Sequence, residues 1–295
     1  MKMKALLMAV ALLSATSLFA QAQQQDFSKV EIKTTKINDK FYTLEGSGGM
    51  IGALIGPDGV FLVDTQYAPL TDKIVAAVKK ISPSPIKFIV NTHVHGDHTG
   101  GNENFGKLGA VIFSRDQLRA RLARPAGNAQ PAPPAALPVV TYDGPLTIHM
   151  NGEDVQLIPI RSAHTDGDTL VRFPGFDVVM TGDYYRSIQY PNIDRANGGS
   201  LNGMIEGLGT TIGLAGLNTK IIPGHGPTVD RAAVIAHRDM IVTIRDRVAQ
   251  MVKQGKTAQE IVAAKPTADY DSKIDQAGTT GERFINQVYA ELGGK

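Results

Sequence analysis

Residues 93–98 read His-Val-His-Gly-Asp-His and place four possible metal ligands within six positions. They follow a short apolar run that is typical of a buried strand. In an extended segment, side chains two residues apart point to the same side, so His93 and His95 can bind one ion. The intervening glycine permits a sharp bend, after which Asp97 and His98 can point towards a second ion. The chain must therefore fold so that a strand ends where metal ligands converge.

Three later segments repeat one design, in which an apolar strand ends in a possible ligand beside glycine or another turn residue. The ligands at their ends are His164, Asp183 and His225. Scaffolds usually present functional groups on strand ends and on the loops that follow them. A set of imidazoles and carboxylates suits Zn²⁺, and also Fe or Mn. Residues 93–98 and the three later segments together hold five of the seven histidines. We expect the other two, His149 and His237, to be structural.

The chain has no cysteine among its 295 residues. This excludes a disulfide framework, a thiol nucleophile, an iron–sulfur cluster and every zinc site that needs a thiolate. A hydrophobic fraction of 42% is typical of a globular protein rather than a disordered one. The length suits one large domain or two small ones.

Residues 1–22 are predicted to be a signal peptide. Lys2 and Lys4 precede an apolar run, and Ala20-Gln21-Ala22 supplies small residues at the positions that define cleavage. The strongly apolar part is shorter than the roughly 20 residues that span a bilayer, so we expect no membrane anchor after cleavage. The sequence thus predicts an exported protein, either periplasmic or secreted.

Removal of this leader also changes the charge balance. The full chain carries 30 Lys and Arg against 28 Asp and Glu, and the leader holds two of the lysines. The remaining chain is formally neutral, whereas nucleic-acid binding depends on a basic surface. We therefore expect a small-molecule substrate and no nucleic-acid partner. The oligomeric state is left open.

The distribution of apolar residues predicts strands followed by helices in each half of the chain. The predicted strands are 29–35, 41–44, 50–55, 60–64, 87–90, 110–113, 146–150, 155–160, 171–173 and 178–181. The predicted helices are 71–81, 114–122 with Ser114 as its cap, and four near 200–215, 230–253, 257–264 and 280–292. Five prolines in residues 125–138 predict an exposed loop that could cover a cleft. This pattern suits sheets packed together with helices outside.

The ligand-bearing segments resemble the metallo-β-lactamase superfamily, over about residues 29–230. The resemblance implies an α/β (α+β) fold, a four-layer αββα sandwich with a two-metal site at one edge of the sheets. Residues 23–295 would form a single domain of this type with C-terminal helices. By motif, His93, His95 and His164 would hold the first Zn²⁺, Asp97, His98 and His225 the second, and Asp183 would bridge the two.

The chain looks most like the glyoxalase II and lactonase branches of this superfamily. True metallo-β-lactamases generally lack an aspartate at the bridging position, and one subclass has a cysteine ligand that this chain cannot supply. Another subclass lacks that cysteine and is often exported, so cleavage of penicillins or carbapenems stays open as an alternative.

A two-zinc site implies a hydrolase. The ions would lower the pKa of bound water and give a hydroxide at neutral pH, which would attack an ester, thioester, lactone or lactam carbonyl. Asp97 would also act as the catalytic residue that orients the hydroxide or moves its proton. Asp166 and Asp168 would hydrogen-bond the ligand histidines or cap a turn. Arg186, with Tyr184, Tyr185 and Tyr190, would line the substrate cleft or pack in the interior.

Three other functions fit the sequence less well. An iron-dependent oxidoreductase acting on sulfur compounds or oxygen is disfavoured because flavodiiron-type relatives place a glutamate at the position of His95. A nuclease is disfavoured by the neutral charge, and a non-catalytic binding protein by the intact ligand set.

Overall fold

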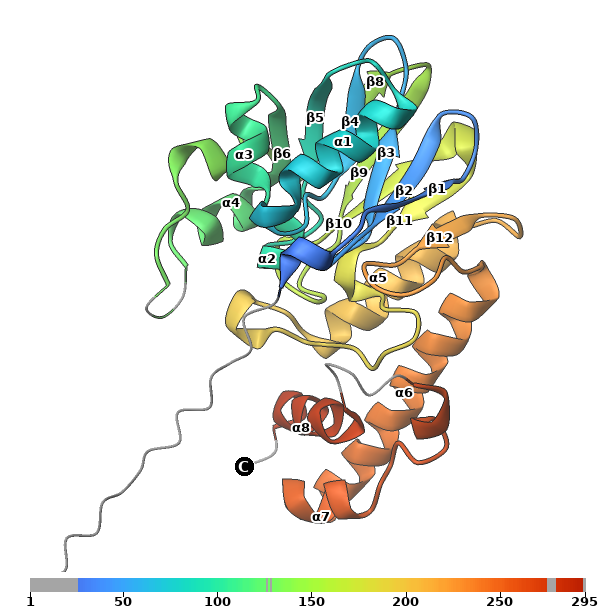
Figure 1. Ribbon diagram of the computed structural model, residues 1–295. Helices are drawn as coiled ribbons and strands as arrows, with labels where there is room; N and C mark the ends of the chain where they lie inside the picture. Colours follow the sequence, from blue (N-terminus) through green and yellow to red (C-terminus); the bar gives the residue numbers. More distant parts are fainter. Residues whose placement is uncertain (1–25, 126, 128, 275–279, 294–295) are drawn as a thin grey trace, which may run out of the picture.

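The structure is a computed structural model that describes residues 26–125, 127, 129–274 and 280–293. The predicted signal peptide, residues 1–22, lies outside them. Within the described residues, the strands form two sheets, one of seven strands and one of five (Figure 1). The larger sheet has the order β1 (Lys33–Lys36), β2 (Phe41–Glu45), β3 (Ile51–Leu54), β4 (Val60–Val63), β5 (Ile86–Val90), β6 (Val111–Arg115) and β7 (Val140–Tyr142). The smaller sheet has the order β12 (Lys220–Ile222), β11 (Val178–Met180), β10 (Thr169–Phe173), β9 (Glu153–Pro159) and β8 (Leu146–Met150).

Strand direction changes within each sheet. In the larger sheet, β1 to β4 pair antiparallel and β4 to β7 pair parallel. In the smaller sheet, β8 to β11 pair antiparallel and β11 pairs parallel with β12. The carboxyl ends of β4 and β5 therefore lie at one edge of the larger sheet, and those of β9, β11 and β12 at one edge of the smaller sheet.

The helices lie outside the two sheets (Figure 1). Their bounds are α1 (Thr71–Ile81), α2 (Gly96–Thr99), α3 (Asn102–Lys107), α4 (Asp116–Ala123), α5 (Leu201–Leu214), α6 (Arg231–Lys253), α7 (Ala258–Ala263) and α8 (Gly281–Glu291). None of the helices among the described residues is both long and apolar enough to cross a lipid bilayer.

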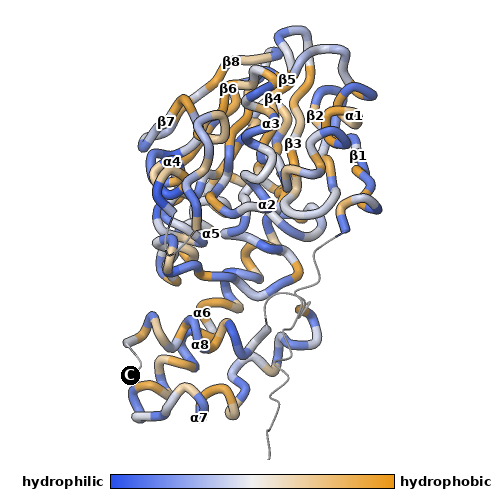
Figure 2. The backbone as a smooth tube through the Cα atoms, turned by 60° about the vertical axis from the view of Figure 1, so that its left-hand side comes forward, coloured by the Kyte–Doolittle hydropathy of each residue, from blue (hydrophilic) through white to orange (hydrophobic). Residues whose placement is uncertain are grey.

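Alternating side chains divide the interior into layers. In β4, Phe61 and Val63 face a cluster between the sheets, where they meet residues of the second sheet such as Val171. Their neighbours Val60 and Leu62 face the opposite way, towards α1 and α3. A third cluster packs the outer face of the second sheet against α5, α6 and α8. Hydrophobic segments accordingly follow the strands in Figure 2. The expected αββα sandwich is confirmed.

The predicted helix over residues 71–81 matches α1, and the four C-terminal helices match α5 to α8 within a residue or two. The prediction of a helix starting at a Ser114 cap was wrong. Ser114 is buried within β6, and α4 begins only at Asp116. The strand continues because the side chain of Arg115, 2% exposed, reaches the carbonyl oxygens of Ile160 and Asp166 in the second half of the chain. Within the predicted loop 125–138, residues 129–133 have no regular structure, and a short 3-10 turn, Pro134–Ala136, follows them.

The two histidines outside the ligand motifs differ in environment. His149 in β8 is exposed and pairs with Asp154 at 2.6 Å. His237 in α6 is buried edge-on against Tyr185, and its Nε2 has no hydrogen-bond partner among the described residues. Burial lowers the pKa of His237 to about 4 from a usual 6.5.

We expect His237 to make stability depend on pH. The unfolded chain takes up a proton on His237 near its usual pKa of 6.5, whereas the folded protein keeps this imidazole neutral down to about 4. Stability is therefore complete above the unfolded value and falls as pH drops, by about 2 kcal/mol between about pH 7.5 and about pH 5. Urea unfolding of the metal-free protein at these two pH values should show a smaller loss for His237→Phe than for wild type. His149→Gln is the control and should lose as much as wild type; equal losses in all three proteins would contradict the expectation.

Candidate functional site

All seven predicted ligands lie at the edge where the strands of both sheets end. His93, His95, Asp97 and His98 follow β5, and His164 lies in the loop between β9 and β10. Asp183 and His225 follow the neighbouring strands β11 and β12. Backbone hydrogen bonds join the two sheets here, from Thr169 to Thr92 and from Met50 to Gly224. Segments distant in sequence are thus fixed beside one another.

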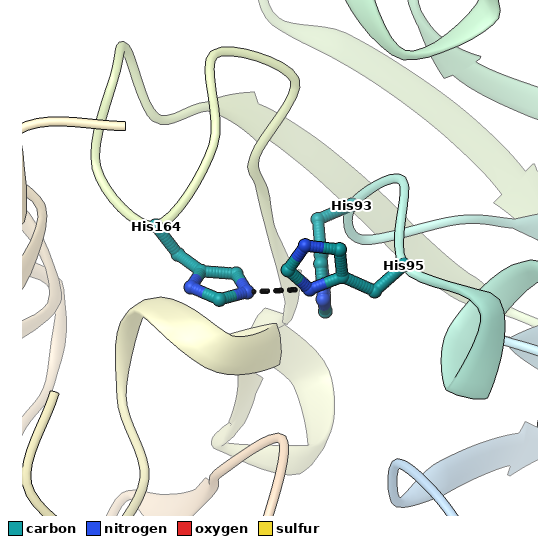
Figure 3. Close-up of side chains that lie close together, drawn as sticks. All are labelled: His93, His95 and His164. Atoms are coloured by element: carbon teal, nitrogen blue, oxygen red, sulfur yellow. Dashed lines mark hydrogen bonds between the residues drawn. The ribbon is translucent and has the colours of Figure 1, made fainter. Parts of the chain in front are cut away.

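Three imidazoles form the first group. Ring nitrogens of His93, His95 and His164 all lie within 4.8 Å of one another. Figure 3 shows the three rings converging, with His164 Nε2 at 2.9 Å from His95 Nδ1. His93 and His164 are buried, and the side chain of His95 is 27% exposed.

Hydrogen bonds on the far sides of these rings determine which nitrogen carries the proton. His164 Nδ1 lies 2.5 Å from the carbonyl oxygen of Asn192, which can only accept, so Nδ1 donates. His95 Nε2 likewise donates to the Asp194 carboxylate at 2.7 Å. The facing atoms, His164 Nε2 and His95 Nδ1, are therefore both lone pairs when the rings are neutral. Two lone pairs at 2.9 Å repel each other unless a cation lies between them.

Asp64 and Thr92 orient the third ring of this group. Thr92 Oγ1 donates its proton to Asp64 Oδ2 at 2.7 Å. The hydroxyl oxygen of Thr92 is therefore the acceptor for His93 Nδ1, which lies 3.1 Å away. His93 Nε2 is then a buried lone pair that has no hydrogen-bond partner in the described part of the chain. Asp64 Oδ2 also accepts from His98 Nδ1 at 2.7 Å. The Asp64 carboxylate thus orients His98 directly and His93 indirectly, through the hydroxyl of Thr92.

Asp97, His98 and His225 form the second group. His225 Nε2 lies 3.1 Å from Asp97 Oδ2 and 3.5 Å from His98 Nε2. Asp183 lies between the two groups: its oxygens are 3.2 Å from His98, 3.3 Å from His225 and 3.9 Å from His164. Its Oδ1 is buried without a hydrogen-bond partner within the residues described. This is the position that a bridging ligand would occupy.

The pKa shifts follow burial and the surrounding carboxylates. Burial, assisted by the neighbouring imidazoles, lowers the pKa of His93 well below its usual value and that of His164 to about 4. Burial would also lower the pKa of His98, but Asp183 and Asp64 outweigh it and raise that pKa. Asp183 is buried too, yet His98 and His225 hold the pKa of its carboxyl well below the usual range. The neutral imidazole is therefore favoured at His93 and His164, whereas the carboxylates around His98 favour a positive charge at that position.

These residues fit divalent metal ions. Imidazole and carboxylate are the ligands that zinc accepts when no thiolate is present, and a ligand imidazole must be neutral. The lone pairs of His93, His95 and His164 meet this requirement, and the carboxylate of Asp183 beside His93 and His98 offers a further ligand atom. His93, His95, His98 and His164 each also have their other nitrogen bonded to an oxygen atom, as is usual around metals.

Two glycines permit the close approach of neighbouring segments. A Cβ atom at Gly224 would overlap Asp183 Oδ1, and one at Gly199 would overlap the carbonyl oxygen of His164. A larger residue at either position would displace a predicted ligand.

Access to the cluster is from one side. The side chains of Asp97 and His225 are each 21% exposed, and with His95 they form its open face, whereas His98 is fully buried. Arg186 adds a positive charge beside this cluster, with its Nε 3.8 Å from Asp183 Oδ2. A substrate would therefore meet Asp97, His225 and His95 first.

Several weaker predictions around the site left two alternatives open, and the structural alternative is confirmed for Asp168 and for the three tyrosines. Asp166 binds Arg121 through both oxygens, and Asp168 binds the backbone of His164 and Thr165, so neither touches a ligand imidazole. Asp168 thus caps the turn, which was the alternative prediction. The side chains of Tyr184, Tyr185 and Tyr190 are buried in the core cluster rather than lining a cleft.

The residues that do support the ligands were missed. They are Asp64, Thr92, Asn192 and Asp194. Asp64 at the end of a predicted buried strand was the one available signal, since an ionised side chain is rarely buried without a partner. Asn192 acts through its backbone carbonyl, which no residue-type pattern can reveal.

The sequence of the chain is similar to those of several known proteins. The sequence model of the metallo-beta-lactamase superfamily matches residues 46–229. The 2,4-dinitroanisole O-demethylase subunit alpha of Nocardioides sp. (strain JS1661) is 26% identical over 165 residues, which are 52% of this chain and 48% of that protein. The linear primary-alkylsulfatase of Pseudomonas sp. (strain ATCC 19151) is 23% identical over 283 residues, 79% of this chain and 53% of that one. The chain therefore spans about half the length of these curated relatives.

Solved structures show the same fold. The sec-alkylsulfatase Pisa1 from Pseudomonas sp. superposes with a TM-score of 0.70 at 17% identity, over 88% of this chain and 50% of that chain. A metallo-beta-lactamase from Pontibacter korlensis gives a TM-score of 0.62 at 18% identity, over 72% of this chain and 99% of that chain.

Proposed function

The chain belongs to the metallo-beta-lactamase superfamily, and we propose that it is an exported hydrolase that uses two zinc ions to cleave an ester, thioester, lactone or lactam. One observation carries the proposal. Lone pairs of three imidazoles, His93, His95 and His164, face one another while their other nitrogens are bonded elsewhere. A metal cation held by these lone pairs would remove their mutual repulsion.

Each residue of the cluster has a part in this proposal. His93, His95 and His164 would hold one ion, Asp97, His98 and His225 the other, and Asp183 would contact both. When bound, zinc supplies a Lewis acid that lowers the pKa of water towards neutrality and polarises a carbonyl oxygen. The buried histidines keep water from the far side of the site, so the substrate enters by the open face.

Asp97 at the open face and Arg186 beside the cluster would act on the substrate. Asp97 is ionised, since its hydrogen bond from His225 and the charge of His98 lower the pKa of its carboxyl despite burial. It would orient the attacking water and accept its proton. Arg186 would bind an anionic group of the substrate, because a guanidinium pairs well with carboxylate or sulfate.

Hydrolysis of an alkyl sulfate ester is a second candidate. The alkylsulfatase relative aligns over 79% of this chain, and the likeness in fold to the sec-alkylsulfatase extends over 88% of it, against 72% for the lactamase. The positive charge of Arg186 beside Asp183 suits a sulfate group. Cleavage of penicillins or carbapenems is the alternative for a lactam substrate.

A metal analysis combined with a substrate panel tests the proposal. Purified protein loaded with zinc should retain about two ions per chain after desalting. It should hydrolyse at least one compound among acyl-lactones, thioesters, a penicillin, a carbapenem and a primary alkyl sulfate, and a chelator should stop this activity. Protein that binds no metal and cleaves none of these compounds would refute it. Cell fractionation and the mass of the mature chain test export, which predicts cleavage after Ala22.

A further inference from the structure

Two consecutive peptide groups lie between His164 and helix α8. In the first, the Asn192 carbonyl accepts from His164 Nδ1 at 2.5 Å, while the N–H of Ile193 donates to Gln287 Oε1 at 3.2 Å. In the second, the Ile193 carbonyl accepts from Gln287 Nε2 at 3.2 Å, while the N–H of Asp194 donates to the His164 carbonyl at 3.0 Å. Peptide groups are planar, so fixing one side fixes the other. Each group is thus held by Gln287 on one side and by His164 on the other.

Further contacts attach the same segment to α8. Gln287 Nε2 also donates to Asn192 Oδ1 at 3.1 Å, and Arg283 donates to that oxygen at 2.7 Å. The side chain of Ile193, 3% exposed, lies in the core cluster with Phe284 of α8. The segment is consequently seated on the C-terminal helix by both polar and apolar contacts.

The second ligand histidine depends on this segment as well. The Asp194 carboxylate accepts from His95 Nε2, and Asn197 Nδ2 donates to the same Asp194 oxygen, both at 2.7 Å. Asp194 follows directly on Ile193, whose carbonyl Gln287 holds. The position of α8 therefore influences the orientation of two of the three imidazoles in Figure 3, those of His164 and His95.

We propose that Gln287 is a positioning residue, which orients His164 and His95 for a metal ion by holding the peptide groups on either side of Ile193. The inference rests on the proposed function, because it takes these histidines to be metal ligands. Helix α8 lies outside residues 46–229, the range that the superfamily model matches. The segment after the matched region thus contributes to the site through Gln287.

The experiment compares Gln287→Met with Asn286→Met in the full chain. Methionine keeps the length of the glutamine side chain and removes its hydrogen bonds. Asn286 is exposed, and replacing this neighbour in α8 gives a matched control. The zinc affinity is measured by competition with a chelator, the geometry by the visible spectrum of the cobalt-loaded protein, and the stability by urea unfolding of the metal-free protein.

We expect Gln287→Met to weaken zinc binding about 10-fold, the lower end of the range for residues that orient metal ligands, and to change the cobalt spectrum. Asn286→Met should do neither. A purely structural role for Gln287 predicts lower stability with unchanged affinity and spectrum, and that result would overturn the inference.

A second variant keeps the test decisive if Gln287→Met does not fold. Asn192→Ala removes the side-chain contact to Gln287 and Arg283 but keeps the carbonyl that His164 uses. It should weaken zinc binding in the same direction, and an unchanged affinity would count against the inference. Wild-type protein that binds no divalent metal would refute the proposed function, whereas normal binding by wild type and by Gln287→Met would refute the inference alone.

Discussion

Replacement of Asp183 by asparagine is expected to remove one of the two bound metal ions and to lower kcat/KM about 10⁴-fold, or about 5 kcal/mol of transition-state stabilisation. The carboxylate of Asp183 is buried and lies within 3.3 Å of both His98 and His225. An amide of nearly the same shape lacks the negative charge, and its NH₂ group would face imidazole lone pairs. The substitution therefore changes charge and leaves the volume of the side chain nearly unaltered.

The measurements are metal content after desalting and steady-state kinetics with a substrate identified in the panel. Asp154→Asn is the matched control, since it makes the same change at an exposed residue that pairs with His149. It should keep two ions and normal activity. If Asp183→Asn keeps its full metal content and full activity, Asp183 does not bridge the two ions.

Asp97→Ala is expected to lower kcat about 10³-fold, within the range for loss of a group that transfers protons. Its carboxylate is at the open face of the cluster, 3.1 Å from His225 Nε2, where it can contact both the metal and the attacking water. Because Gly49 bonds to the backbone carbonyl of Asp97 rather than to its side chain, the loop should keep its conformation.

Excess zinc separates the two roles of Asp97. If the residue only binds metal, saturating zinc restores kcat in Asp97→Ala. If it also orients water and accepts the proton, kcat stays low when both ions are bound. We expect the second result, and full activity in Asp97→Ala would count strongly against the proposed mechanism.

The convergence of the candidate ligands could be predicted from the sequence because their segments follow short apolar strands. Such strands end at one edge of a sheet, so local pattern and pairing together bring His93, His95 and His164 close. The helix over residues 71–81 was predicted for a similar reason, since its apolar spacing depends only on local geometry.

The supporting residues could not be predicted in this way. Asn192 holds His164 through a backbone oxygen, and Gln287 acts across 94 residues of chain on Ile193. Nothing in the residue types at these positions distinguishes them from surface residues. The extension of β6 through Ser114 could not be predicted either, because it also depends on a contact between distant residues. Arg115 donates to carbonyl oxygens about 50 residues away, such as that of Asp166.

The carboxylate of Asp64 would constrain any attempt to engineer the metal selectivity of this protein. It holds His98 directly and His93 through Thr92, and in the proposed two-metal site these histidines belong to different ion positions. A substitution that adapts one position to a larger or softer ion shifts the shared carboxylate and so distorts the other. Selectivity at the two positions would therefore have to be engineered jointly, with Asp64 left in place.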